Sequence, residues 1–355
     1  MITIKKTLIA LGALSVTACA IAQSNITLFG VVDSSVARIK TDTASNTGLA
    51  SGGLASSRLG FRGVEDLGGG LAAGFWLEAG LSVDNGNSSG FSFDRRSTVS
   101  LSSSSLGEVR IGRDKSPAYL NIETFDPFAD IGVGGYYASN MLGNATAAAG
   151  TPEGSAPKRA SNSVQYVLPK LGGFYGQVMY AFGEQLDNVP NDRLRNSAAL
   201  RFGYAEGPLN VAFGHGQIRG GTTVTGVDYK STNLGASYDL GLVKPMFLFA
   251  SERSSGRRID MYGIGATVPF GSGELRATLS TFNRKDADDA DSKKFALGYG
   301  YNLSRRTQIY GSISRVNNDA SATRGLAVSS SSLANPSVRA GSSVTGYELG
   351  LRHSF

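Results

Sequence analysis

The chain ends in the segment Ser343-Val344-Thr345-Gly346-Tyr347-Glu348-Leu349-Gly350-Leu351-Arg352-His353-Ser354-Phe355. Large apolar residues alternate with glycine and polar residues, at Tyr347, Leu349, Leu351 and Phe355. Because successive side chains of a β-strand point to opposite faces, this alternation predicts a strand with one apolar face. Such a strand suits a barrel wall with lipid on one side and water on the other.

The opposite end of the chain has the pattern of a secretory leader. Lys5 and Lys6 form a basic start, Leu8 to Val16 an apolar stretch, and Ala20-Ile21-Ala22 a cleavage site of the small-x-small kind. The apolar stretch is too short to span a bilayer, so we expect residues 1–22 to be a removed signal peptide. A lipoprotein signal acylated at Cys19 is the alternative. Cleavage after Ala22 removes the only cysteine, lowers the formal net charge from +6 to +4 with the loss of two lysines, and leaves residues 23–355 as one barrel domain.

Composition supports a β-barrel and excludes several other classes. Mean hydropathy is −0.08, and no run after the leader approaches the roughly 18 apolar residues that a membrane helix needs. The small, diffuse positive charge does not indicate a nucleic-acid partner. His215 and His353 lie far apart, and no Gly-x-Ser-x-Gly motif is present, so we expect no enzyme activity, no metal site and no cofactor. The acidic residues of segment 286–291 could attract a divalent cation, but a solvated loop is the better interpretation.

Period-two segments closed by turn residues predict an all-β fold with sixteen antiparallel transmembrane strands. They lie near 25–36, 55–64, 71–83, 91–103, 107–113, 160–168, 174–182, 196–204, 209–216, 231–239, 244–252, 260–268, 274–282, 294–302, 306–316 and 343–355. Short and long connections alternate along the chain. An even number of strands, with short turns at one rim and long loops at the other, is typical of bacterial outer-membrane barrels.

Two connections are unusually long. Residues 114–158 are too many for an ordinary rim loop, and the lumen is the space available to such an insertion. We therefore expect this third long loop to fold inward, with external disorder as the alternative because of the Ala/Gly tract at 143–150. The stretch 317–341 is Ser-rich and without periodicity, and we interpret it as an exposed surface loop only.

Several segments resemble the general porins of β-proteobacteria, in the same order over the whole mature chain. They are Ile26-Thr27-Leu28-Phe29-Gly30-Val31-Val32-Asp33, Ser57-Arg58-Leu59-Gly60-Phe61-Arg62-Gly63-Val64-Glu65-Asp66-Leu67-Gly68-Gly69-Gly70-Leu71, Arg95-Arg96-Ser97-Thr98-Val99-Ser100-Leu101, Gly107-Glu108-Val109-Arg110-Ile111-Gly112-Arg113, Asn162-Ser163-Val164-Gln165-Tyr166 and the final Phe355. The chain is most similar to the anion-selective type from Comamonas-like and Bordetella-like bacteria. The resemblance implies a sixteen-stranded homotrimeric porin whose third loop narrows each pore.

Alternation alone predicts which charged side chains face the lumen. Leu59 and Phe61 share a face, so Arg58 and Arg62 point the other way. The same argument turns Glu78 inward on the third predicted strand, Arg110 on the fifth and Arg159 on the sixth. A basic residue on the lipid face near mid-membrane costs about 2–4 kcal/mol, which favours the lumen for each arginine.

The resemblance implies a constriction, with arginines on one wall and acidic groups opposite. The family pattern falls on Arg58, Arg95, Arg159, Glu78 and Asp126. Strict alternation from Val99 and Leu101 instead turns Arg96 inward and Arg95 outward, so either residue could line the pore, with a bulge required for Arg95.

We therefore expect a Gram-negative outer-membrane porin, a water-filled channel for passive diffusion of small hydrophilic solutes that favours anions. Its expected surroundings are outer-membrane lipid and lipopolysaccharide, two further copies of the chain, and small anions. A barrel that serves mainly as an adhesin or structural anchor, with its pore plugged or unused, is the alternative function.

Overall fold

The structure is a computed structural model that describes residues 25–86, 92–138, 141–144, 158–186, 188–189, 192–221, 226–326, 328, 333 and 336–355. The strands are β1 Asn25–Lys40, β2 Ser45–Ser51, β3 Arg58–Gly68, β4 Leu71–Gly80, β5 Arg96–Ser103, β6 Gly107–Lys115, β7 Arg159–Val167, β8 Phe174–Ala181, β9 Ser197–Glu206, β10 Leu209–Gly221, β11 Gly226–Tyr238, β12 Lys244–Ser254, β13 Arg257–Phe270, β14 Gly273–Arg284, β15 Ser292–Asn302, β16 Thr307–Asn318 and β17 Val344–Ser354. The helices are α2 Pro117–Thr124 and α3 Met141–Asn144. The predicted signal peptide lies outside the described residues, as does most of the Ala/Gly tract.

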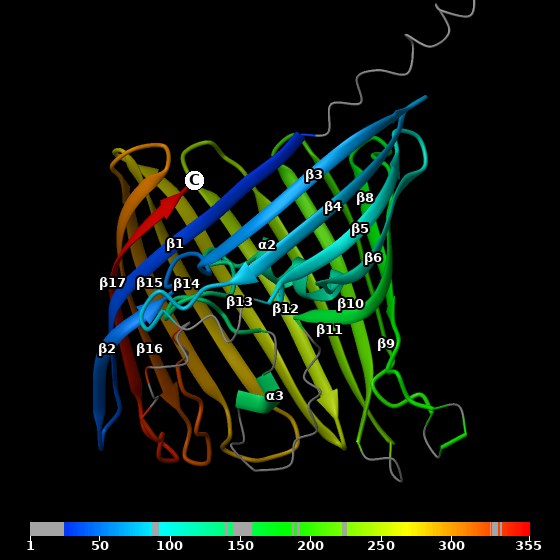
Figure 1. Cartoon of the computed structure of the whole chain (residues 1–355). Helices are drawn as coiled ribbons and strands as arrows, with labels where there is room; N and C mark the ends of the chain where they lie inside the picture. The colour runs from blue at the N-terminus through cyan, green and yellow to red at the C-terminus, as the bar shows by residue number, and fades with distance from the viewer. Residues whose placement is uncertain are drawn as a thin grey trace, which may run out of the picture.

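All strands form one antiparallel sheet that closes into a barrel (Figure 1). β1 and β17 pair over Val31–Lys40 and Thr345–Ser354, which joins the two ends of the chain. Short connections and the C-terminus lie at one end of the barrel and long loops at the other. This architecture confirms the predicted sixteen-stranded fold, with one addition in the first loop.

The addition is β2, which shares one barrel position with β3. β1 pairs with β2 through Ser34–Lys40 and with β3 through Asn25–Val31. The two short strands therefore follow one another along the same edge, and the 17 strands occupy sixteen positions. The segment Ser45-Asn46-Thr47-Gly48-Leu49-Ala50-Ser51 is mostly polar, so its sequence carried no clear alternation by which to predict a strand.

The two faces of the wall follow the predicted alternation. On β17, Leu349 is 70% exposed on the outer face, whereas Glu348 is 3% exposed on the inner face. Large apolar side chains are exposed in the same way around the outer surface, as expected for contact with lipid. Among the described residues, no helix is long and apolar enough to cross a membrane.

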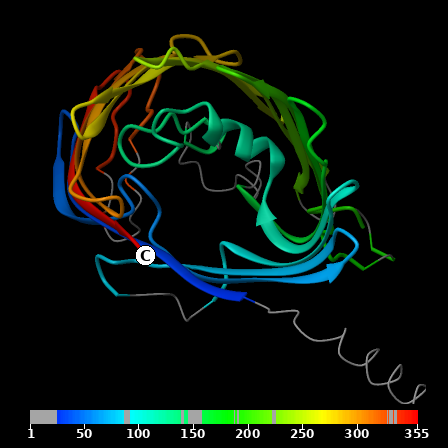
Figure 2. The same ribbon diagram turned by 90° about the horizontal axis from the view of Figure 1, so that it is seen from above.

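The third loop folds into the barrel, as predicted. Figure 2 shows α2 and the chain after it inside the ring of strands. Ser116 caps the N-terminus of α2 by accepting the N–H of Tyr119, and Pro117 occupies the first turn, which needs no donor there. Ile122, Phe125, Tyr136, Met141 and Leu142 then pack against buried apolar residues of β10–β14. The loop therefore covers one side of the inner wall.

The last long loop differs from its interpretation as an exposed surface loop. Leu326, Val328 and Leu333 are buried in an apolar cluster with Val133 of the third loop and residues of β1, β2, β16 and β17. Arg324 is 5% exposed, and its guanidinium lies 3.8 Å from the centre of the Phe282 ring. These few apolar residues are enough to draw the loop inward, although its Ser-rich composition concealed them.

Candidate pore constriction

Charged side chains gather on the inner face of five neighbouring strands, opposite the side that the third loop covers. We call this group the arginine wall, and it comprises Arg58, Arg95, Arg96, Arg110, Arg159, Lys115, Glu78, Glu108 and Asp114. Alternation on β3–β6 places most of them, because the residues between them, such as Val99, Val109 and Ile111, are exposed on the outer face.

Glu78 on β4 lies between Arg58 of β3 and Arg95, which directly precedes β5. Its Oε1 lies 2.6 Å from Nε of Arg95 and 3.8 Å from Nε of Arg58. Its Oε2 accepts a hydrogen bond of 3.2 Å from the indole Nε1 of Trp76. The Glu78 carboxylate therefore holds Arg95 close to Arg58, on the neighbouring strand.

Arg95 and Arg96 both reach acidic partners. Arg96 begins β5 directly opposite Glu78, and its Nε lies 3.5 Å from Oδ2 of Asp114 and donates to Thr98 Oγ1 at 3.0 Å. Arg95 precedes β5, so strand alternation does not determine the direction of its side chain. Its backbone N–H donates to the backbone carbonyl of Glu78 at 3.1 Å. No bulge is needed for Arg95 to reach the same side. Which of the two limits the passage of solutes remains a prediction.

Arg110 continues the wall on β6. Its Nη2 lies 2.8 Å from Oε2 of Glu108, and its Nη1 lies 3.4 Å from Oδ2 of Asp114. Asp114 is thus shared between Arg110 and Arg96. Both carboxylates come from β6 itself, so this part of the wall is closely neutralised.

Arg159 begins β7 opposite Lys115. Its charge interacts with Arg95 and with the carboxylates of Glu123 and Glu78. No ion pair within 4.0 Å is formed by Arg159 among the described residues, in contrast to Arg95, Arg96 and Arg110. Arg58 and Arg159 are therefore the least neutralised arginines of the wall.

The acid that the third loop presents to this wall is Glu123, at the end of α2. Lys115 Nζ lies 2.7 Å from its Oε2, and the charges of Arg58 and Arg159 also interact with it. Sequence reasoning missed both Lys115 and Glu123 as site residues. The Ser116-Pro117 helix start was the available signal, because it places Glu123 on the short helix that follows the strand.

Asp126 lies elsewhere, which differs from the expectation that it opposes the arginines. It is 4% exposed, and its carboxylate accepts the backbone N–H groups of Phe128, Asp130 and Tyr136. Burial, and secondly the nearby Asp130, raise the pKa of Asp126 to about 7. The buried Asp126 carboxylate therefore holds the backbone of the third loop through these three N–H groups.

Arg62 faces the lumen on β3, nearer the short-turn end of the barrel. Its guanidinium lies 5.5 Å from the centre of the Phe29 ring and 5.3 Å from that of Trp76. The structure therefore places it beside aromatic rings and apart from the ion pairs of the arginine wall. Among the residues that the structure describes, no group of three or more His, Cys, Asp or Glu could hold a metal ion.

This fold and site define a membrane-spanning β-barrel channel whose lumen is charged and narrowed by an inserted loop. The family model for Gram-negative porins matches residues 7–321, and the chain belongs to that family. Outer membrane porin protein 32 of Delftia acidovorans is 38% identical, over 99% of this chain and 100% of the relative. An outer membrane porin protein of Bordetella pertussis is 28% identical, over 86% and 92%.

A solved structure supports the same assignment. The anion-selective porin from Comamonas acidovorans matches with a TM-score of 0.85 and 36% identity, covering 94% of this chain and 100% of that chain. The resemblance to porins is confirmed, and the protein is located in the Gram-negative outer membrane.

Proposed function

We propose that the barrel is a passive diffusion channel for small hydrophilic solutes that favours anions, and that the arginine wall and Glu123 form its selectivity filter. One observation carries the proposal: the arginine wall holds six cationic side chains, and only four carboxylates accompany them, three from the wall itself and Glu123 from the inserted loop. The cations are Arg58, Arg95, Arg96, Arg110, Arg159 and Lys115, and the carboxylates are Glu78, Glu108, Asp114 and Glu123.

The surplus of positive charge acts on ions because the charged side chains are partly buried in the wall, where water screens them less. Low-dielectric walls focus the field and raise the local concentration of counter-ions. Cations are slowed and not blocked, because Glu78 and Glu123 remain among the arginines. The anion selectivity of the Comamonas relative supports this sign of preference. Passage by diffusion requires no catalytic step, and the relatives are porins rather than enzymes.

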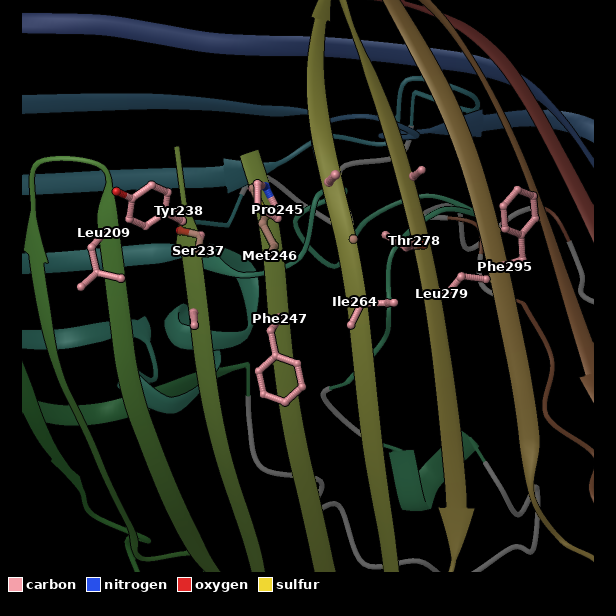
Figure 3. A pocket seen from close by; sticks show the side chains of 14 residues that line it. Leu209, Ser237, Tyr238, Pro245, Met246, Phe247, Ile264, Thr278, Leu279 and Phe295 are labelled. Carbon is pink, nitrogen blue, oxygen red and sulfur yellow. The ribbon is translucent and has the colours of Figure 1, made fainter. Parts of the chain in front are cut away.

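We propose further that three copies of the chain assemble in the outer membrane, as the resemblance to porins implies. The outer surface supports contact with lipid or with a neighbouring subunit. An apolar hollow of about 660 Å³ lies over β10–β15. Figure 3 shows Tyr238, Ile264, Leu279 and Phe295 among the side chains that line it. Its size and apolar lining suit an acyl chain of an outer-membrane lipid or lipopolysaccharide.

The zero-current potential of the purified protein tests the function. In a planar bilayer with a potassium chloride gradient, we expect stepwise conductance and a potential displaced toward the equilibrium potential of chloride. A displacement toward potassium would refute the anion preference. Insertion of the barrel without conductance would favour the adhesin or anchor alternative.

A further inference from the structure

Trp76 is the centre of a second group of lumen residues, which adjoins the ion pairs of the arginine wall through its hydrogen bond to Glu78. It is paired directly with Arg62 on β3, and Arg96 reaches it from β5 on its other side, with the guanidinium 4.6 Å from the ring centre. Phe29 on β1 contacts the indole edge-on, at 4.9 Å between ring centres. Two rings and a guanidinium therefore form one continuous patch across β1, β3 and β4.

The backbone at Gly60 makes room for this patch. Phe29 and Gly60 are opposite one another in the β1–β3 pair, and a Cβ at Gly60 would lie only 2.3 Å from Cζ of Phe29. The end of the Phe29 ring thus lies over the glycine, with Arg62 beside the ring. Any larger residue at position 60 would push the ring away.

Arg62 differs from Arg95, Arg96 and Arg110 in its electrostatic surroundings. Its side chain is exposed, and no carboxylate of the described residues lies within ion-pair distance of it. A guanidinium that stacks on aromatic rings keeps its N–H edge free, and that edge matches the two oxygens of a carboxylate. Arg62 is four residues nearer the short turn than Arg58, roughly 13 Å along the strand.

We propose that Arg62, Phe29 and Trp76 form a subsite that binds carboxylates carrying an aromatic ring, on the short-turn side of the arginine wall. The carboxylate pairs with the edge of Arg62, and the ring of the solute packs beside Phe29, in the offset or edge-on geometry that aromatic pairs prefer. The subsite deepens the proposed channel function, on which it rests, by naming a class of solute that the pore retains longest.

The single tryptophan of the chain makes the subsite directly observable. Trp76 is that residue, so tryptophan fluorescence of the purified, folded protein reports on this position alone. We would titrate the protein at constant ionic strength with benzoate, with cyclohexanecarboxylate as a non-planar control, and with acetate as a control without a ring. We expect a saturable change with benzoate, binding at least about fivefold weaker for cyclohexanecarboxylate, and no saturable change with acetate.

Three variants assign the response to named groups. Arg62→Gln should weaken benzoate binding about tenfold or more, because a charge-assisted hydrogen bond contributes more than one factor of ten. Phe29→Leu should bring benzoate and cyclohexanecarboxylate to similar affinity. Lys230→Gln, on the outer face of β11, should leave the titration unchanged.

Conductance measured on the same preparations tests the proposed channel function separately from the proposed subsite. If the protein conducts and favours anions, but benzoate gives no saturable response, the subsite is refuted and the channel function stands. An unchanged benzoate affinity in Arg62→Gln, or equal affinities for benzoate and cyclohexanecarboxylate in the unaltered protein, would also overturn the proposal. If Arg62→Gln yields no folded barrel, Arg62→Lys replaces it, and an unchanged benzoate affinity in that variant counts against the bidentate pairing.

Discussion

At the scale of single residues, the pore depends on which charges remain unpaired. Glu78 lies against Arg95 at 2.6 Å, whereas its distance to Arg58 is 3.8 Å. Arg159 forms no ion pair among the described residues within 4.0 Å and also faces the like charge of Arg95. Arg58 and Arg159 should therefore attract mobile anions more strongly than the paired arginines do.

Replacing Arg58 and Arg159 together by Ser should shift the zero-current potential toward cations. The measurement is the reversal potential in a salt gradient, at low and at high salt. Exposed charges are screened over about 8 Å at physiological ionic strength and about 3 Å at 1 M, so the shift should shrink as salt rises. The matched control is Lys230→Ser, outside the lumen, which should have little effect. An unchanged potential at low salt would place selectivity elsewhere.

Asp126 should matter for the shape of the loop and not for selectivity. Asp126→Ala leaves three buried N–H groups without their acceptor, at a cost of about 1–3 kcal/mol for each unsatisfied group. We expect noisier and more variable single-channel currents with the same sign of selectivity. Asp288→Ala, in an exposed loop, is the control. Quiet currents with a changed selectivity would show instead that Asp126 acts as a pore charge.

Residue positions could be predicted from the sequence wherever a strand constrains them. Arg58, Glu78 and Arg110 follow from period-two alternation, because apolar residues such as Leu59, Leu77 and Ile111 occupy the alternate positions of their strands. Arg95 and Asp126 lie outside strands, so their directions depend on contacts that no local pattern encodes. The Asp126 carboxylate is directed by N–H groups up to ten residues away.

At the scale of elements, the third loop is held by packing on one wall. Phe125 occupies the space above Gly235, where a Cβ would lie 2.0 Å from the ring. Asn121 donates to Asn233 Oδ1 at 2.7 Å and to the carbonyl of Ala212 at 3.0 Å, and Arg201 donates to Asn121 and Thr124. Apolar and polar contacts together fix α2 against β9–β11.

Deleting residues 123–137 should enlarge the pore, because it removes Glu123 and the anchoring residues Phe125 and Tyr136. The measurement is single-channel conductance, with deletion of residues 145–150 as the length control, which we expect to change conductance little. Phe125→Ala is a milder test. Phe-to-Ala changes in packed cores cost about 3–5 kcal/mol, so the loop should detach intermittently. Equal conductance for both deletions would mean that the anchored segment does not narrow the pore.

The sequence predicted long, periodic strands well and short or aperiodic elements poorly. β2 shows that a strand can form without a clear alternation of apolar and polar residues. β1 extends beyond β3, and the free edge of that extension pairs with β2. In the last long loop, the residues buried in the apolar cluster are Leu326, Val328 and Leu333, which follow no strand or helix period in a Ser-rich sequence. Local patterns lack this information, because it depends on the apolar surface that Val133 of the third loop presents.

At the scale of the whole molecule, one seam closes the barrel. Beyond the last pair of β1 and β17, Gly30 donates to the carbonyl of Phe355 at 3.0 Å, and Phe355 donates to that of Gly30 at 3.1 Å. The Phe355 ring covers Gly30 on the outer face, where a Cβ would lie 2.3 Å from its Cζ. An open sheet edge in a bilayer leaves unpaired N–H and C=O groups that lipid cannot satisfy.

Truncation of Phe355 should therefore impair assembly of the barrel more than replacement of its side chain does. The truncated chain loses the two terminal hydrogen bonds and the ring, Phe355→Ala loses only the ring, and Phe355→Tyr keeps both. The measurement is the yield of heat-modifiable barrel in the outer membrane, compared with the total protein exported. We expect yields to fall in the order Phe355→Tyr, Phe355→Ala, truncation, while synthesis and export stay constant. A normal yield from the truncated chain would show that the seam closes without its last residue, and equal losses for Phe355→Ala and truncation would assign the effect to the ring alone.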